Sequence, residues 1–104
     1  MSITNIDVAL LIRILPSDLK LPNLGGRSSF TIRNDGASIE IVNSGGHALQ
    51  LTDAILRTVH MRYIELGAAM QLNAGQYVGP NWPGCPNRIF SPLIAKLVDY
   101  ILSK

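Results

Sequence analysis

The sequence predicts a small α+β domain in which three antiparallel strands form a meander flanked by helices, in the order αβββαα. Residues 30–51 alternate between apolar and polar side chains and are divided by two turns rich in glycine and asparagine. The segments around them, 5–15, 53–66 and 91–103, repeat apolar residues at helical spacing. The chain has 104 residues and a single cysteine, so we expect one domain whose core needs no disulfide.

The first helix is predicted over residues 5–15, where two periodicities compete. Every even position from 6 to 14 is apolar, as in a half-buried strand, but the same residues also form a helical stripe. Thr4 and Asp7 make a capping box, with Asp in place of the usual Glu, and Pro16 supplies a stop. The capping signals favour the helix over the strand.

Three strands are predicted after an irregular connector. Residues 18–27 are expected to form this connector, because Pro22 and a Gly-Gly pair interrupt them. An Asn-Asp-Gly turn, whose residues tolerate positive φ, separates strands at about 30–33 and 38–42. An Asn-Ser-Gly-Gly turn then leads to a short third strand over 47–51. The meander is expected to keep one face toward solvent.

A helix is predicted over 53–66, with Gly67 as its expected terminator, although residues 68–72 could also prolong it. The preceding threonine is the expected N-cap, and the carboxylate of Asp53 suits the positive end of the helix dipole. We expect Arg57, His60 and Arg62 on the exposed side of this helix, with Asp53 and Arg57 forming an i,i+4 ion pair.

Residues 73–90 contain three glycines and three prolines, a density that predicts a loop without regular elements. Loops of this length inside a small domain are commonly functional or packed against the core. Tyr77 and Trp82 favour packing over disorder. The final helix is predicted to begin with Ser91 as N-cap and Pro92 as its first helical residue.

Charged residues are scarce, because they make up 15% of the chain against a typical ~25%. A surface short of charge favours burial against a partner, so we expect a homodimer. The N-terminal residues lack the basic region of a signal peptide, and no uncharged apolar stretch approaches the ~20 residues that span a bilayer. These features predict a cytoplasmic protein that does not use a membrane.

The sequence contains no metal-binding motif and no cofactor motif, because no HxxH, HxxxH or CxxC spacing occurs. Cys85 together with one of the histidines would be the elements of a Cys-dependent hydrolase. The surrounding residues match no catalytic-cysteine signature, and no helix is expected to begin just after Cys85. Cys85 is therefore interpreted as an incidental loop cysteine, and the hydrolase ranks third among the functions.

Nucleic-acid binding is the first function hypothesis. It depends on cationic and titratable residues at three places: on either side of the first strand, at the start of the third strand, and on the helix that follows. A hairpin beside a helix can align such residues along one phosphate track. The alternative interpretation is an ordinary solvated face, with Asp53 and Glu65 neutralising two of the arginines. The predicted contacts are Arg27, Arg33, His47, Arg57, His60 and Arg62.

The second hypothesis is a homodimeric protein-interaction or small-ligand-binding module that uses the aromatic loop. Tyr77, Trp82 and Arg88 are residue types enriched where binding energy concentrates. The competing interpretation is that these aromatic residues only hold the loop against the core.

The run from Pro80 to Arg88, PNWPGCPNR, leads through Ser91-Pro92 into a short helix and belongs to no enzyme motif. In its small size and overall style, the whole chain resembles the orphan proteins of unknown function that bacterial mobile gene cassettes, such as those of integrons, encode. The resemblance implies a bacterial protein and assigns no role to any residue.

Overall fold

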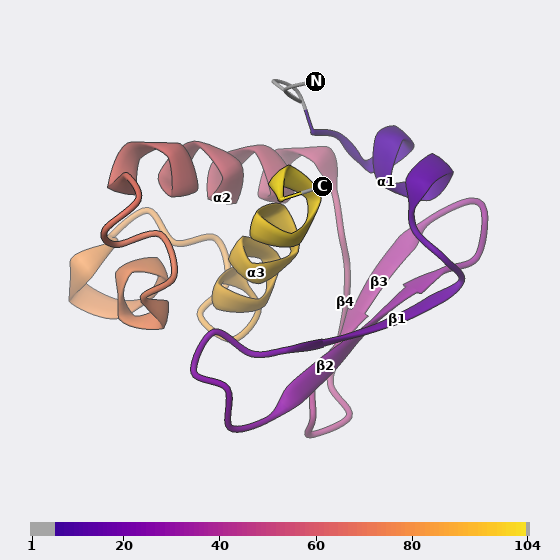
Figure 1. The fold of residues 1–104 in the computed structure, drawn as a ribbon, viewed down its shortest axis with the longest axis horizontal. Coiled ribbons are helices and arrows are strands. Elements are labelled where there is room, and N and C mark those ends of the chain that lie inside the picture. Colours follow the sequence, from indigo (N-terminus) through magenta and orange to yellow (C-terminus); the bar gives the residue numbers. More distant parts are fainter. Residues whose placement is uncertain (1–5, 104) are drawn as a thin grey trace.

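A computed structural model describes residues 6–103 as a four-stranded antiparallel sheet with three helices on one side of it (Figure 1). The strands lie in the sheet in chain order, so each strand pairs with its neighbour in sequence. The α+β prediction is confirmed, with one strand more than expected. The elements are α1 (Val8–Ile14), β1 (Asp18–Pro22), β2 (Ser29–Asn34), β3 (Ile39–Val42), β4 (Ala48–Gln50), α2 (Asp53–Leu66), two 3-10 turns η1 (Ala74–Tyr77) and η2 (Gly79–Asn81), and α3 (Ser91–Leu102).

Strand β1 corrects the prediction of an irregular connector. Leu19 and Leu21 pair with residues of β2 and face the core side, whereas Lys20 between them is exposed. Pro22, the reason for predicting a loop, is the last residue of this edge strand. A proline is tolerated there because an edge strand does not need every backbone N–H for the ladder.

The predicted hairpin and third strand are present. Ile32 pairs with Ile41, and Ile41 pairs with Leu49, so one face of β2, β3 and β4 is apolar. Gly36 has φ 87°, a conformation that side chains with a Cβ rarely adopt, and it makes the tight turn between β2 and β3. The other face carries mostly polar or small residues together with the half-buried Val42, as expected for a sheet with one solvated side.

Helix α1 confirms the helical interpretation of the first segment for the described residues. Asp7 is the N-cap, and its carboxylate accepts a hydrogen bond of 2.8 Å from the Leu10 N–H. Thr4, the predicted capping residue, lies outside the described residues. At the other end, the Asn34 side-chain amide donates to the carbonyls of Ile12 and Leu15 at 2.8 and 2.9 Å. A residue of the hairpin therefore holds the end of α1.

Helix α3 lies between α2 and the sheet and supplies much of the core (Figure 1). Its predicted inward residues are all fully buried: Ile94, Leu97, Val98 and Ile101. The helix begins one residue earlier than predicted, because Phe90 is the N-cap and Ser91 the first helical residue. No helix within residues 6–103 is long and apolar enough to cross a membrane.

Helix α2 matches its predicted bounds. Thr52 is the N-cap, its hydroxyl accepting from the Ile55 N–H, and Gly67 with φ 72° ends the helix. The expected ion pair between Asp53 and Arg57 is not formed; Asp53 Oδ1 accepts the Val8 N–H at 2.8 Å. Asp53 thus joins the start of α2 to the start of α1.

Candidate ligand-binding site

The long loop after α2 is more ordered than predicted, because it contains the two 3-10 turns η1 and η2. Side chains replace the missing regular hydrogen bonds. Asn73 Oδ1 accepts the Gly75 N–H at 3.0 Å, and Asn81 Nδ2 donates to the Gly75 carbonyl at 3.1 Å. The loop therefore has a defined shape of its own.

Arg62 of α2 anchors this loop and is not on the exposed side of the helix as predicted. Its side chain is only 12% exposed. The guanidinium donates to the carbonyls of Gln76 and Asn81 at 3.0 and 2.9 Å, and lies 5.7 Å from the centre of the Trp82 ring. The predicted neighbour Glu65 accepts a further bond of 3.0 Å. Through these contacts, Arg62 connects α2 to the loop and stabilises the loop's conformation.

Tyr77 has a similar supporting role, because its side chain is fully buried. Its hydroxyl donates to the Gln71 carbonyl at 2.7 Å, and burial raises the pKa of this phenol well above its usual value of 10.0. The Trp82 ring stands edge-on to it, with centroids 6.2 Å apart and planes at 81°. Of the two predicted aromatic residues, only Trp82 reaches the surface.

The last part of the loop is held by Cys85 and Asn87. The Cys85 thiol lies 3.1 Å from the Tyr77 carbonyl oxygen and 3.3 Å from the Ser91 hydroxyl. Asn87 Oδ1 accepts the N–H groups of Ile89 and Phe90, the two residues just before α3 begins. The loop therefore leads directly into α3 with fixed geometry.

Two hollows open on this loop, and both are lined by Gly79 and Arg88. The larger, of about 620 Å³, is completed by Val78, Asn87 and Ile89. The smaller, of about 290 Å³, is completed by Trp82, Pro83 and Cys85. An arginine, an indole and a thiol thus border one depressed surface that combines apolar walls with a cation.

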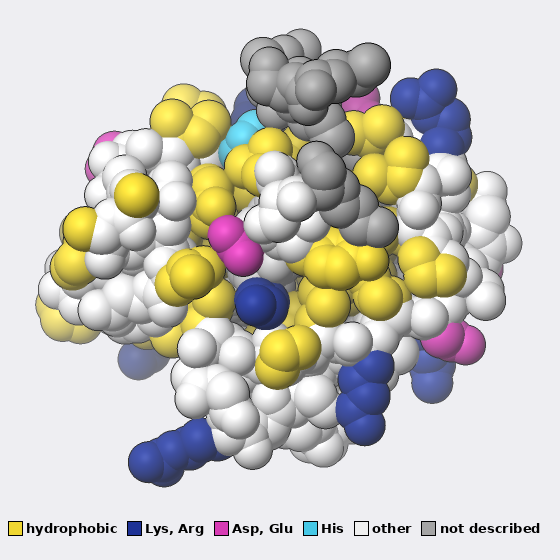
Figure 2. Space-filling model, viewed as in Figure 1, with side chains coloured by type: hydrophobic (Ala, Val, Ile, Leu, Met, Phe, Trp, Pro, Cys, Tyr) yellow, Lys and Arg dark blue, Asp and Glu magenta, His cyan; other side chains and the backbone are white. Residues whose placement is uncertain are grey.

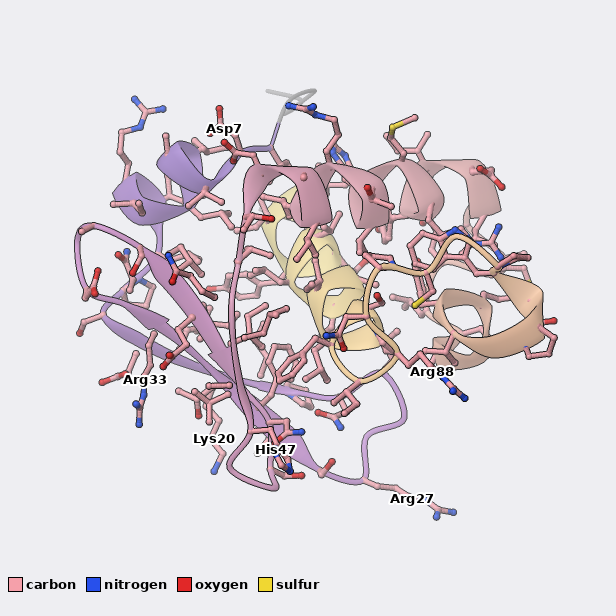
Figure 3. The ribbon with its side chains drawn as sticks, turned by 180° about the vertical axis from the view of Figure 1, so that it is seen from behind. Asp7, Lys20, Arg27, Arg33, His47 and Arg88 are labelled. Carbon is pink, nitrogen blue, oxygen red and sulfur yellow. The ribbon has the colours of Figure 1, made fainter. Side chains whose placement is uncertain are left out.

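Among the residues that the structure describes, Arg88 is the one charged residue that lines these hollows, and its side chain is exposed. Figure 3 shows it extending away from the loop backbone. Within residues 6–103, no carboxylate forms an ion pair with it. Its guanidinium therefore remains available to an anion from solution.

The structure divides the six residues predicted to bind nucleic acid. Arg57 lies exposed on α2, whereas His60 is 8% exposed, so the prediction that His60 faces solvent is wrong. Burial lowers the pKa of His60 below its ordinary value of 6.5, because the charged imidazolium loses solvation. With Arg62 also committed, α2 contributes only Arg57 as a free cation.

The other three predicted residues belong to the sheet side of the molecule, together with a lysine that sequence analysis missed. Arg33 pairs across the strands with Asp18 and Glu40, and its guanidinium lies 3.8 Å from the Glu40 carboxylate. Lys20 was missed because residues 18–22 were not recognised as a strand. Its position between two core-facing leucines therefore did not indicate that it faces solvent. Figure 3 shows four basic or titratable residues along the lower part of the view, where Lys20 and Arg33 point downward and Arg27 extends to the right: Lys20, Arg27, Arg33 and His47.

Cys85 has no histidine among its hydrogen-bond partners in the described part of the chain. His60 is buried in α2, and His47 belongs to the turn before β4. Among residues 6–103, no group of three or more His, Cys, Asp or Glu side chains is arranged to hold a metal ion.

Comparison with known proteins adds one result, which is that the chain matches no protein-family model, no curated protein and no solved structure.

Proposed function

We propose that this protein is a binding module that takes a small organic anion in the hollow bordered by Arg88 and Trp82. The observation that carries the proposal is that an exposed arginine without a carboxylate partner in the described chain lines the same hollow as an indole ring. An arginine guanidinium has the planar, forked geometry that binds carboxylate or phosphate oxygens in pairs. The Trp82 and Pro83 side chains offer an apolar wall beside it.

The rigidity of the loop supports this proposal. Binding is weakened when a loop must be ordered at the moment of association. Here the ordering is already achieved by Arg62 below the loop and by Asn73, Asn81 and Asn87 within it. Small-ligand sites are typically concave, mostly apolar and largely preformed, with a few polar groups that orient the ligand.

The proposal can be tested through Trp82, the only tryptophan of the chain. Benzoate and inorganic phosphate are suitable probes, because benzoate combines a carboxylate with an aromatic ring and phosphate offers the anion alone. We expect a saturable change in tryptophan fluorescence with benzoate. Replacing Arg88 by alanine should weaken binding roughly tenfold or more, since a hydrogen bond to a charged group contributes about 1.5–3 kcal/mol.

The matched control is Arg57→Ala, which removes an exposed arginine from α2 and should leave benzoate affinity unchanged. A response to benzoate but not to phosphate would show that the apolar wall contributes. The absence of any saturable change at millimolar concentrations of both probes, or an unchanged affinity in Arg88→Ala, contradicts the proposed function.

A second candidate is nucleic-acid binding at the outer face of the sheet. It is favoured by the location of Lys20, Arg27, Arg33 and His47 along one border of the molecule (Figure 3). Their distribution follows the strands, since Lys20 and Arg33 are on the same face of paired strands β1 and β2. The carboxylates of Asp18 and Glu40 lie on this face too and reduce its positive potential.

This candidate predicts binding to mixed-sequence single strands or duplex at low salt, measured by fluorescence anisotropy of a labelled oligonucleotide. Replacing Lys20 or Arg33 by alanine should weaken binding similarly for all sequences and lower the salt slope by about one counterion unit each. Arg57→Ala again serves as the control. No binding at tens of micromolar protein would end this candidate.

A further inference from the structure

The outward face of α2 is apolar at positions where a solvent-facing helix is normally polar. Met61 is 63% exposed and Ile64 is 60% exposed, and their three-residue spacing places them on the same side of the helix. Beyond the end of the helix, Met70 and Leu72 are also exposed, at 38% and 53%. Figure 2 shows hydrophobic side chains at the surface over α2, at the upper left of the view. Within the described residues, this face has no covering element.

Two opposite charges lie at equal distances on either side of this apolar centre. Arg57 precedes Met61 by four residues, and Glu65 follows it by four. Arg57 is exposed and forms no ion pair within residues 6–103, and its expected partner Asp53 accepts the backbone N–H of Val8. The Glu65 side chain is 70% exposed and uses one carboxylate oxygen, Oε1, for Arg62. Glu65 therefore still has an oxygen to offer.

We infer that α2 packs antiparallel against α2 of a second copy of the chain, with the two-fold axis beside Met61. A two-fold arrangement is self-complementary, so a residue four positions before the centre faces the residue four positions after it in the other copy. Arg57 of each copy then faces Glu65 of the other, twice over. Met61 and Ile64 lose their exposure to water in the same contact. The charge scarcity of the chain agrees with this, because it leaves few groups that would oppose self-association.

The size of the contact sets the expected strength of the dimer. A helix of 14 residues is about 21 Å long. A stable interface buries roughly 800 Å² on each partner, or about one seventh of the 5924 Å² surface of this chain. A contact between two helices of this length, with Met70 and Leu72 at its margin, is expected to bury less area than this. The dimer is therefore reversible and dissociates on dilution.

Sedimentation velocity of the full chain over a micromolar to submillimolar range measures the dimer directly. We expect a concentration-dependent dimer whose dissociation constant rises by about tenfold or more in Met61→Glu and in Ile64→Glu, because each places a charge in the apolar contact. Both positions are exposed, so the fold should be retained, as circular dichroism can verify. The matched control is Ile14→Glu, which changes an apolar residue of α1 that is 40% exposed and should not affect the dimer.

A charge exchange tests the antiparallel register. Arg57→Glu alone and Glu65→Arg alone should each weaken the dimer, because like charges then face each other, and the double variant should restore it. A monomer at every concentration overturns the inference. So does a dimer whose dissociation constant is unchanged by Met61→Glu and Ile64→Glu, since another surface must then mediate it. A double variant that remains as weak as the single ones overturns the antiparallel arrangement.

Discussion

The contacts of Arg62 make a quantitative prediction about the 73–90 loop. Replacing this arginine by alanine removes two charge-assisted hydrogen bonds to backbone carbonyls, at 3.0 and 2.9 Å, and the contact with the Trp82 ring. Each such bond contributes about 1.5 kcal/mol at the lower end of its range, and the cation–π contact about 0.5 kcal/mol. The exposed Glu65 carboxylate adds little. We expect Arg62→Ala to lower the free energy of unfolding by about 3.5 kcal/mol.

Urea denaturation measures this loss, with circular dichroism reporting the helices and Trp82 fluorescence reporting the loop. Alanine is the best helix former, so α2 itself should not be weakened by the change. At protein concentrations where the chain is monomeric, Arg57→Ala is the control on the same helix, because Arg57 is exposed and its replacement should alter stability by no more than about 0.5 kcal/mol. Arg62→Lys should recover only part of the loss, since an ammonium lacks the fork that reaches two carbonyls.

The result that refutes this reasoning is an Arg62→Ala variant with wild-type stability and unchanged Trp82 emission. The loop would then be held by its asparagine contacts and by Tyr77, without help from α2. If the Trp82 fluorescence of Arg62→Ala instead changes at low urea, before the circular dichroism of the helices is lost, Arg62 stabilises the loop as a separate unit.

Three further predictions concern other parts of the fold. Asn34→Ala should lower the free energy of unfolding by about 2 kcal/mol in urea, because two carbonyls at the end of α1 lose their donor. Gly36→Ala should cost about 1 kcal/mol, since φ is 87° there, whereas Gly25→Ala, which has open space and no positive φ, should change stability little. Burial lowers the pKa of His60 below 6.5, because the folded protein favours the neutral imidazole. The free energy of unfolding is therefore unaffected by this group above pH 6.5 and decreases as the pH falls through the folded pKa of His60. His60→Gln should flatten this part of a stability–pH profile.

Local signals predicted much of the fold correctly. The Asn-Asp-Gly turn identified the β2–β3 hairpin because one of its residues, Gly36, requires positive φ. Thr52 and Gly67 marked the two ends of α2, where a hydroxyl satisfies a free N–H and a glycine adopts φ 72°. The apolar spacing of α3 was also sufficient, because every residue of its inward stripe is buried.

Strand β1 was missed because its evidence is not local. Leu19 and Leu21 are too few to establish an alternating pattern, and Pro22 argues against a strand when position in the sheet is unknown. The strand exists because β2 offers it a partner from Asp18 to Pro22. Pairing between strands depends on the whole sheet, so the sequence of a single short segment predicts it only weakly.

The candidate site shows the same division. Trp82 and Arg88 were recognised as potential binding residues, and they line one hollow. Tyr77 was grouped with them from its residue type, but only its complete burial assigns it to the support of the loop. For Arg62 and His60, helical position alone indicated the exposed side. A loop folded back from 14 and 19 residues further along supplies carbonyls to Arg62.

By itself, the sequence determined the three helices and the strands β2, β3 and β4, because caps, turn glycines and apolar periodicity act over a few residues. Tertiary structure decided the fourth strand, the burial of Arg62, His60 and Tyr77, and the meeting of Trp82, Cys85 and Arg88 around one hollow. These features depend on contacts between segments distant in the chain. A polar side chain at the border of a helix face is equally compatible with water or with a buried carbonyl. Which one it meets depends on where the rest of the chain folds.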